Sequence, residues 1–138
     1  MYNKIMVPVD LAHLDQLAKA LEVAADLARH YGAEVCYAGV TATAPSPLAH
    51  TPQEYQQKLD AFSKQQAAEH GQAVSARVVI SHDPAADLDA VLVKAIEESG
   101  VDLVVMGTHL PRHLGILMPS HGGKVATHTD ASILLVRP

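Results

Sequence analysis

The stretch VDLVVMGTHLPRHLGILMPSHGGKV, from Val101 to Val125, decides the fold class of this 138-residue chain. Its apolar run Leu103–Met106 predicts a strand buried on both faces, and Gly107 ends that strand. A loop rich in hydrogen-bonding groups follows, and a helix is predicted from about Ser120 to His128. A buried strand, a polar loop and a helix start in this order are the usual layout of an anion or nucleotide site at the carboxyl end of a parallel strand.

Four other segments of the chain have the apolar, β-branched character of strands. They are Lys4–Val9, Glu34–Val40, Ala73–Ile80 and Ser132–Val136. Pro8 lies within the first of them, and proline has no N–H group to donate to a neighbouring strand. We therefore expect the pairing of the first strand to end at Pro8.

Three further helices are predicted between these strands. The 3.6-residue spacing of apolar side chains predicts the first from about Leu14 to Tyr31. A capping residue followed by proline begins the second at residues 51–52 and the third at residues 83–84. Each of the three is followed by a glycine that can end a helix in the left-handed conformation: Gly32, Gly71 and Gly100.

Strands and helices that alternate in this way predict an α/β fold. We expect one domain over residues 1–138, built on an open, doubly wound, five-stranded parallel sheet of order 3-2-1-4-5 with helices on both faces. In such a sheet, ligands bind outside the carboxyl ends of the strands where the winding reverses, between strands one and four. Here those ends are Val9–Asp10 and Met106–Thr108, so the loop after the fourth strand lies at the expected ligand position.

The composition excludes several classes of function. A formal charge of −5 and scattered basic residues argue against a nucleic-acid or anionic lipid surface. No apolar run has the length of a membrane span, so no membrane insertion is expected. A lone cysteine cannot form an internal disulfide, and the start of the sequence does not resemble a secretory leader. We therefore expect a cytoplasmic protein.

Five segments spread over the chain carry a family resemblance. In order, they are KIMVPVD, ALEVAADLARHYGAEV, SHDPAADLDAVLVKA, VDLVVMGTH and ASILLVRP. Together they resemble the universal stress protein family, over the whole chain. The best fit is to a branch with a shorter loop and His-x-Pro after the fourth strand, here His109 and Pro111, with Pro119 and Ser120 in place of that branch's Gly-Ser. In the longer-loop pattern, Leu110 would stand in place of a glycine.

The resemblance implies an adenine nucleotide alpha hydrolase-like fold and a nucleotide site for ATP or AMP, with Mg²⁺ as a candidate accompanying ion. The implied nucleotide-binding residues are Pro8, Val9, Asp10, Val40, Gly107, Thr108, His109, Ser120, His121 and Gly122. Asp10 and the backbone at Val9 and Val40 would meet the adenine and ribose. Chemistry alone leaves alternatives: Asp10 can cap the first helix, Ser120 is a good N-cap, and Gly107 can serve a tight turn that needs positive φ.

Catalytic and metal-binding residues are not expected. His109, His113 and His121 are the candidate metal ligands, but Pro111 argues against a regular helix that would place the first two on one face. Cys36 lies within a predicted strand, which suits a small core residue better than a nucleophile. The sequence therefore predicts a binding protein rather than an enzyme.

The implied function is that of a regulatory stress-response protein that binds an adenine nucleotide. The alternative is a nucleotide-free member of the family that acts only through protein contacts, and a slow nucleotide hydrolase ranks last. The final strand, Ser132–Val136, is an apolar edge, and unpaired edges of this kind associate with other strands. We therefore expect a homodimer through this strand, and a regulatory protein partner such as a transporter or a kinase.

Pro119 generates a direct test of phosphate binding. A glycine at that position offers an N–H group and lets a phosphate approach closely, whereas proline has no N–H and places a ring in the way. We expect Pro119→Gly to increase the rise in Tm that ATP produces, measured by thermal shift. An unchanged response in the variant would show that the proline does not obstruct the phosphates.

Overall fold

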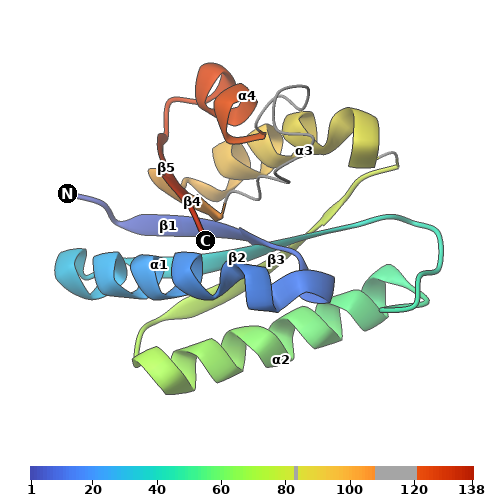
Figure 1. Cartoon of the computed structure of the whole chain (residues 1–138), viewed down its shortest axis with the longest axis horizontal. Coiled ribbons are helices and arrows are strands. Elements are labelled where there is room, and N and C mark those ends of the chain that lie inside the picture. The colour runs from blue at the N-terminus through green and yellow to red at the C-terminus, as the bar shows by residue number, and fades with distance from the viewer. Residues whose placement is uncertain (83, 108–120) are drawn as a thin grey trace.

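The computed structural model describes residues 1–82, 84–107 and 121–138, which form one five-stranded sheet flanked by helices (Figure 1). In chain order the elements are β1 (Lys4–Val9), η1 (Leu11–Leu17), α1 (Ala18–Tyr31), β2 (Glu34–Thr41), α2 (Pro52–His70), β3 (Val74–Ile80), α3 (Pro84–Ser99), β4 (Leu103–Gly107), α4 (His121–His128) and β5 (Ser132–Val136). The strand order is β3-β2-β1-β4-β5, and each neighbouring pair is parallel. The predicted fold class and strand order are confirmed.

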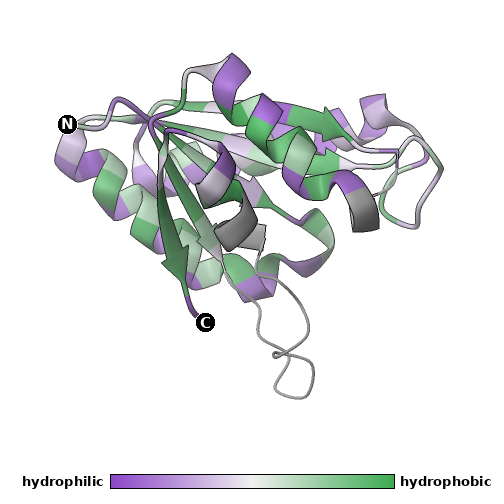
Figure 2. Ribbon diagram, turned by 90° about the horizontal axis from the view of Figure 1, so that it is seen from above, coloured by the Kyte–Doolittle hydropathy of each residue, from purple (hydrophilic) through white to green (hydrophobic). Residues whose placement is uncertain are grey.

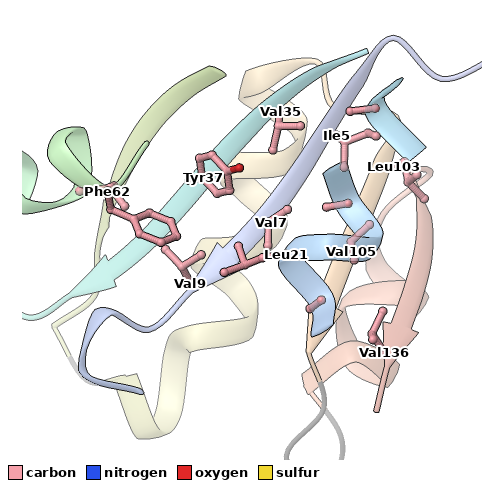
Figure 3. Close-up of a cluster of buried hydrophobic side chains, with 14 of the residues drawn as sticks. Ile5, Val7, Val9, Leu21, Val35, Tyr37, Phe62, Leu103, Val105 and Val136 are labelled. Carbon is pink, nitrogen blue, oxygen red and sulfur yellow. The ribbon is translucent and has the colours of Figure 1, made fainter. Parts of the chain in front are cut away.

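The sheet separates two apolar layers. Alternate side chains of β1 point to opposite faces: Ile5, Val7 and Val9 pack with α1 and α2, and Met6 packs with α3. Figure 3 shows the first of these layers, in which Tyr37 meets Phe62 edge to face with ring centroids 5.2 Å apart. Cys36 is buried in the second layer, as expected of a small core residue.

The predicted cap of α2 and the three predicted glycine stops are confirmed, whereas the predicted cap of α3 at residue 83 lies outside the described residues. Thr51 Oγ1 accepts a hydrogen bond from the Glu54 N–H at 3.1 Å, and Glu54 Oε2 accepts one from the His50 N–H at 3.1 Å. Together they satisfy two N–H groups around the start of α2. The three predicted stops take positive φ: Gly32 at 66°, Gly71 at 68° and Gly100 at 67°.

Two local predictions are wrong. The α-helix expected from about Leu14 begins at Ala18, because a 3₁₀ helix with a kink at His13 (φ −136°, ψ 46°) occupies the preceding residues. Pairing of β1 with β2 does not end at Pro8 but continues to Val9↔Gly39. Within the described residues, β1 pairs with β4 only at Ile5↔Leu103 and Met6↔Val104. Near Pro8, β1 therefore stops pairing with β4 but continues to pair with β2.

Asp102 ties the amino-terminal ends of the central strands together. Its carboxylate accepts hydrogen bonds from the Asn3 N–H at 3.0 Å and from the Lys4 N–H at 3.1 Å. Its backbone N–H donates to the Lys4 carbonyl at 3.1 Å, and its carbonyl accepts from the Ser132 N–H at 3.0 Å. One residue at the start of β4 thus sets the position of β1 and β5.

We expect Asp102→Ala to lower the free energy of unfolding by about 1–2 kcal/mol, because two backbone N–H groups lose a charged acceptor. Urea denaturation followed by circular dichroism measures the change. Asp130→Ala, an exposed aspartate just before β5, is the matched control and should leave stability nearly unchanged. Equal losses in the two variants would contradict this role for Asp102.

Candidate functional site

The candidate site lies at the carboxyl ends of β1, β2 and β4. The register pairs Val9 of β1 with Gly39 of β2, and Val40 comes next along β2. In the described residues, pairing between β1 and β4 stops at Met6↔Val104, before either strand ends. The last residues of these two strands therefore lie outside a shared ladder, at the point where a doubly wound sheet receives its ligand.

The predicted residues on β1 and β2 come together at this edge. Val9 is buried in the layer under α1 and α2, and Val40 packs against the layer under α3. Pro8 is half-buried. Val9 therefore offers the edge no exposed side chain, whereas Pro8 and Val40 are partly exposed.

Asp10 follows directly at the end of β1, and its side chain is 64% exposed. Oδ1 accepts a hydrogen bond from the Ala12 N–H at 3.0 Å, and Oδ2 lies 2.8 Å from His13 Nδ1. The capping alternative for Asp10 is therefore confirmed, for a 3₁₀ helix rather than for α1. A carboxylate has about four acceptor positions, so these two contacts leave capacity for donors from a ligand.

His13 is a member of this site that the sequence analysis missed. The hydrogen bond to Asp10 and the negative charge of that carboxylate raise the pKa of His13 above 6.5, and Asp15 adds to the effect. The only sequence signal was the spacing Asp-x-x-His at a strand end, which is common in surface loops. The pairing depends on the kink at His13, because a regular helix would not take these dihedral angles.

Tyr55 closes one side of the site, and the sequence analysis missed it too. The ring is buried against Gly39, where an added Cβ would lie 2.7 Å from Tyr55 Cε1. Burial, together with the nearby charge of Asp10, raises the pKa of Tyr55 to about 12, although a hydrogen bond with the backbone at Leu11 opposes the rise. A glycine within a strand, which often marks a close approach, was the available signal.

Gly107 at the end of β4 is needed for close packing. Among the described residues, positive φ occurs at Gly32, Gly71 and Gly100, so the alternative of a positive-φ turn at Gly107 is wrong. An added Cβ at Gly107 would lie 2.9 Å from Leu17 Cδ2 and 3.6 Å from the Ala20 Cβ. The absence of a side chain lets the start of α1 approach the end of β4.

The structure describes only some of the other predicted site residues. Thr108, His109 and Ser120 lie outside the described residues, as do His113 and Pro119. The backbone of His121 and Gly122 forms the first turn of α4.

No group of three or more His, Cys, Asp or Glu side chains in residues 1–82, 84–107 and 121–138 is arranged to hold a metal ion. None of the helices in the described part of the chain combines the length and hydropathy of a membrane span.

Comparison with known proteins decides the family. The model of the universal stress protein family matches residues 1–137. The chain belongs to the universal stress protein family. No curated protein sequence matches the chain.

Solved universal stress proteins share this fold. A universal stress protein in complex with cAMP is 22% identical, with a TM-score of 0.73 over 99% of this chain and 97% of that one. The Archaeoglobus fulgidus protein in complex with dAMP is 18% identical, with a TM-score of 0.66 over 97% of each chain. An Arabidopsis thaliana family member with AMP bound is 16% identical, with a TM-score of 0.69 over 98% of this chain and 91% of that one.

In this universal stress protein, the Asp10 carboxylate predicts a raised pKa for His13. We expect the pKa of His13, followed by NMR, to lie above 6.5 and to fall toward that value in Asp10→Asn, because the variant loses the carboxylate charge. Since the folded-state pKa is raised, the pair stabilises the protein below pH 6.5, and this contribution is lost as the pH rises through the folded-state pKa. An unchanged His13 pKa in Asp10→Asn would contradict the assignment.

Proposed function

We propose that this universal stress protein binds an adenine nucleotide at the carboxyl ends of β1, β2 and β4, and acts as a cytoplasmic regulator without turnover. The observation that carries the proposal is the exposed Asp10 carboxylate beside the point where the sheet changes winding direction. The family context supports it, since structures with the same fold hold cAMP, dAMP and AMP.

The groups around Asp10 suit a nucleoside. Ribose hydroxyls are donors that a carboxylate with free acceptor positions can bind. Backbone groups of Val9 and Val40 can hydrogen-bond an adenine edge, because the ladder between β1 and β2 ends at Val9↔Gly39. Tyr55 fills the space against Gly39 on the α2 side, which confines the base to the side that carries Val40 and Pro8.

The phosphates would lie toward Gly107, the sequence that follows it, and the first turn of α4. Pro119 removes one N–H donor from that sequence. We therefore propose that nucleotides with one phosphate bind more tightly than ATP, and that Mg²⁺ takes part only when ATP is bound. The acidic residue of the site, Asp10, is already held by Ala12 and His13, so it is a poor candidate for a general base.

The edge strand β5 supports a homodimer as part of the proposal. Leu134 and Leu135 are 37% and 41% exposed, and Figure 2 shows the strand that ends at the carboxyl terminus in hydrophobic colours. An exposed apolar edge strand can pair with a second copy. A regulatory protein partner would then act on the dimer.

A nucleotide-free protein that acts through protein contacts is the second candidate. The observation that favours it is that both oxygens of Asp10 already have partners within the chain. Leu110 and Pro119, which stand where family patterns have glycine, point in the same direction.

Titration with AMP, cAMP and ATP, with and without Mg²⁺, tests the proposal by calorimetry and thermal shift. We expect AMP to raise Tm, because a free AMP concentration of 100 times Kd stabilises the native state by about 2.7 kcal/mol. Asp10→Asn keeps an oxygen that can cap Ala12 but loses the charge, so we expect at least a tenfold weaker Kd.

Asp15→Asn is the control, because it makes the same change of charge at an exposed position five residues further on. The Kd of this variant for AMP should stay near that of the unmodified protein. No shift with any of the three nucleotides would reject nucleotide binding and leave the second candidate. Equal losses in Asp10→Asn and Asp15→Asn would show that Asp10 has no direct role.

A further inference from the structure

The first residues of the 3₁₀ helix η1 form the turn by which the chain leaves β1 beside the candidate nucleotide site. The first N–H groups of a helix have no acceptor within the helix itself. In η1 the Ala12 N–H donates to Asp10 Oδ1, and the His13 N–H donates to the Asp10 carbonyl, both at 3.0 Å. Asp10 thus satisfies two of these groups, and the N–H of Leu11 needs an acceptor from another element.

Tyr55 of α2 supplies that acceptor. A hydrogen bond between Tyr55 and the backbone at Leu11 lowers the pKa of the phenol, against the rise that burial causes. A hydrogen bond lowers the pKa of an acid when it stabilises the ionised form, and a phenolate oxygen is stabilised by a donor. The donor is therefore the Leu11 N–H, and a residue of α2 satisfies the start of η1.

The phenol oxygen of Tyr55 lies at the end of the ladder between β1 and β2. Gly39 pairs with Val9 there, and a Cβ added to Gly39 would lie 2.8 Å from Tyr55 Oη and 2.7 Å from Tyr55 Cε1. Tyr55 is 4% exposed, so packing on its other sides holds the ring in this position. Asp10 follows Val9 directly, so the hydroxyl lies beside the main chain that carries the Asp10 carboxylate.

We propose that Tyr55 is a positioning residue of the nucleotide site, whose hydroxyl holds the turn from β1 into η1 so that the Asp10 carboxylate meets the ribose hydroxyls. This inference rests on the proposed function. The Asp10 side chain is 64% exposed, and its hydrogen bonds are to residues of the same turn, so the position of the turn decides where the carboxylate lies. Tyr55 thereby sets the preference of the site for ligands that carry ribose hydroxyls.

Binding of AMP and of 2′,3′-dideoxyadenosine 5′-monophosphate, measured by calorimetry, tests this role. The two nucleotides differ only in the hydroxyls that Asp10 would bind. Tyr55→Phe keeps the ring against Gly39 and removes the phenol oxygen. We expect this variant to bind AMP about fivefold more weakly, the equivalent of roughly one hydrogen bond. Its affinity for the dideoxy nucleotide should stay close to that of the unmodified protein.

Tyr37→Phe is the matched control. Tyr37 is 1% exposed and belongs to the same apolar layer, where Figure 3 shows its ring. Burial raises the pKa of its phenol to about 12, as it does for Tyr55. Tyr37 pairs with Val7, however, and not with the end of the ladder. Tyr37→Phe should therefore leave the affinities for both nucleotides unchanged.

Two further measurements separate positioning from a general effect on the fold. In the absence of nucleotide, Tyr55→Phe should weaken the bond between Asp10 and His13, so that the pKa of His13 measured by NMR falls toward 6.5, whereas Tyr37→Phe should not change it. Gly39→Ala displaces the same ring through its added Cβ, so it should also lower the ratio of AMP affinity to dideoxy nucleotide affinity. All affinities are compared at a temperature at which circular dichroism shows each variant to be folded.

Equal losses of affinity for AMP and for the dideoxy nucleotide in Tyr55→Phe would overturn the inference, since the hydroxyl would then serve the fold as a whole. Unchanged AMP affinity in that variant would overturn it as well. Both outcomes leave the proposed function in place, because the unmodified protein still binds AMP. An unmodified protein that does not bind AMP would reject the proposed function, and this inference with it.

Discussion

Burial of the central strand on both faces is the constraint on which the rest of the structure depends. Ile5, Met6 and Val7 of β1 are each 0% exposed, and their side chains alternate between the two faces. A parallel strand of this kind requires helices on both sides of the sheet. The chain must therefore leave β1 in one winding direction and return to β4 in the other. That reversal leaves the carboxyl ends of these two strands open to a ligand.

The same close packing shapes the walls of the candidate nucleotide site. Gly107 lets α1 approach the end of β4, and Gly39 makes room for the ring of Tyr55. These contacts leave Asp10 at the exposed end of β1, where its carboxylate holds the short 3₁₀ helix and pairs with His13. In the described residues, the site is thus formed by the ends of three strands, the Asp10 carboxylate, His13 and Tyr55. The topology of the sheet sets the location of the site, whereas the close contacts at Gly39 and Gly107 set which side chains surround it.

The α1–α2 face carries a different kind of surface. There the sheet is covered by helices whose exposed sides are polar, and the buried Gln66 amide oxygen has no hydrogen-bond partner among the described residues. The described residues between α1 and α2 line a shallow groove with glutamate, glutamine and apolar side chains, a surface different in chemistry from the strand ends. The nucleotide site lies where strands end, whereas this groove lies where two helices meet over the apolar layer.

The sequence by itself determined the five strands, the α-helices between them and their order, because these depend on signals between near neighbours. The Thr51–Glu54 cap, the glycine stops and the apolar strands are all of this kind. Of the predicted site, the sequence located Val9, Asp10 and Val40 at one edge, but not their partners. The bonds of Asp102 to residues 98 and 99 positions away, and the contact of Tyr55 with Gly39, were decided only by the tertiary structure. The physical reason is that such contacts depend on distance in space, and no local pattern in the chain records which distant residues packing will bring together.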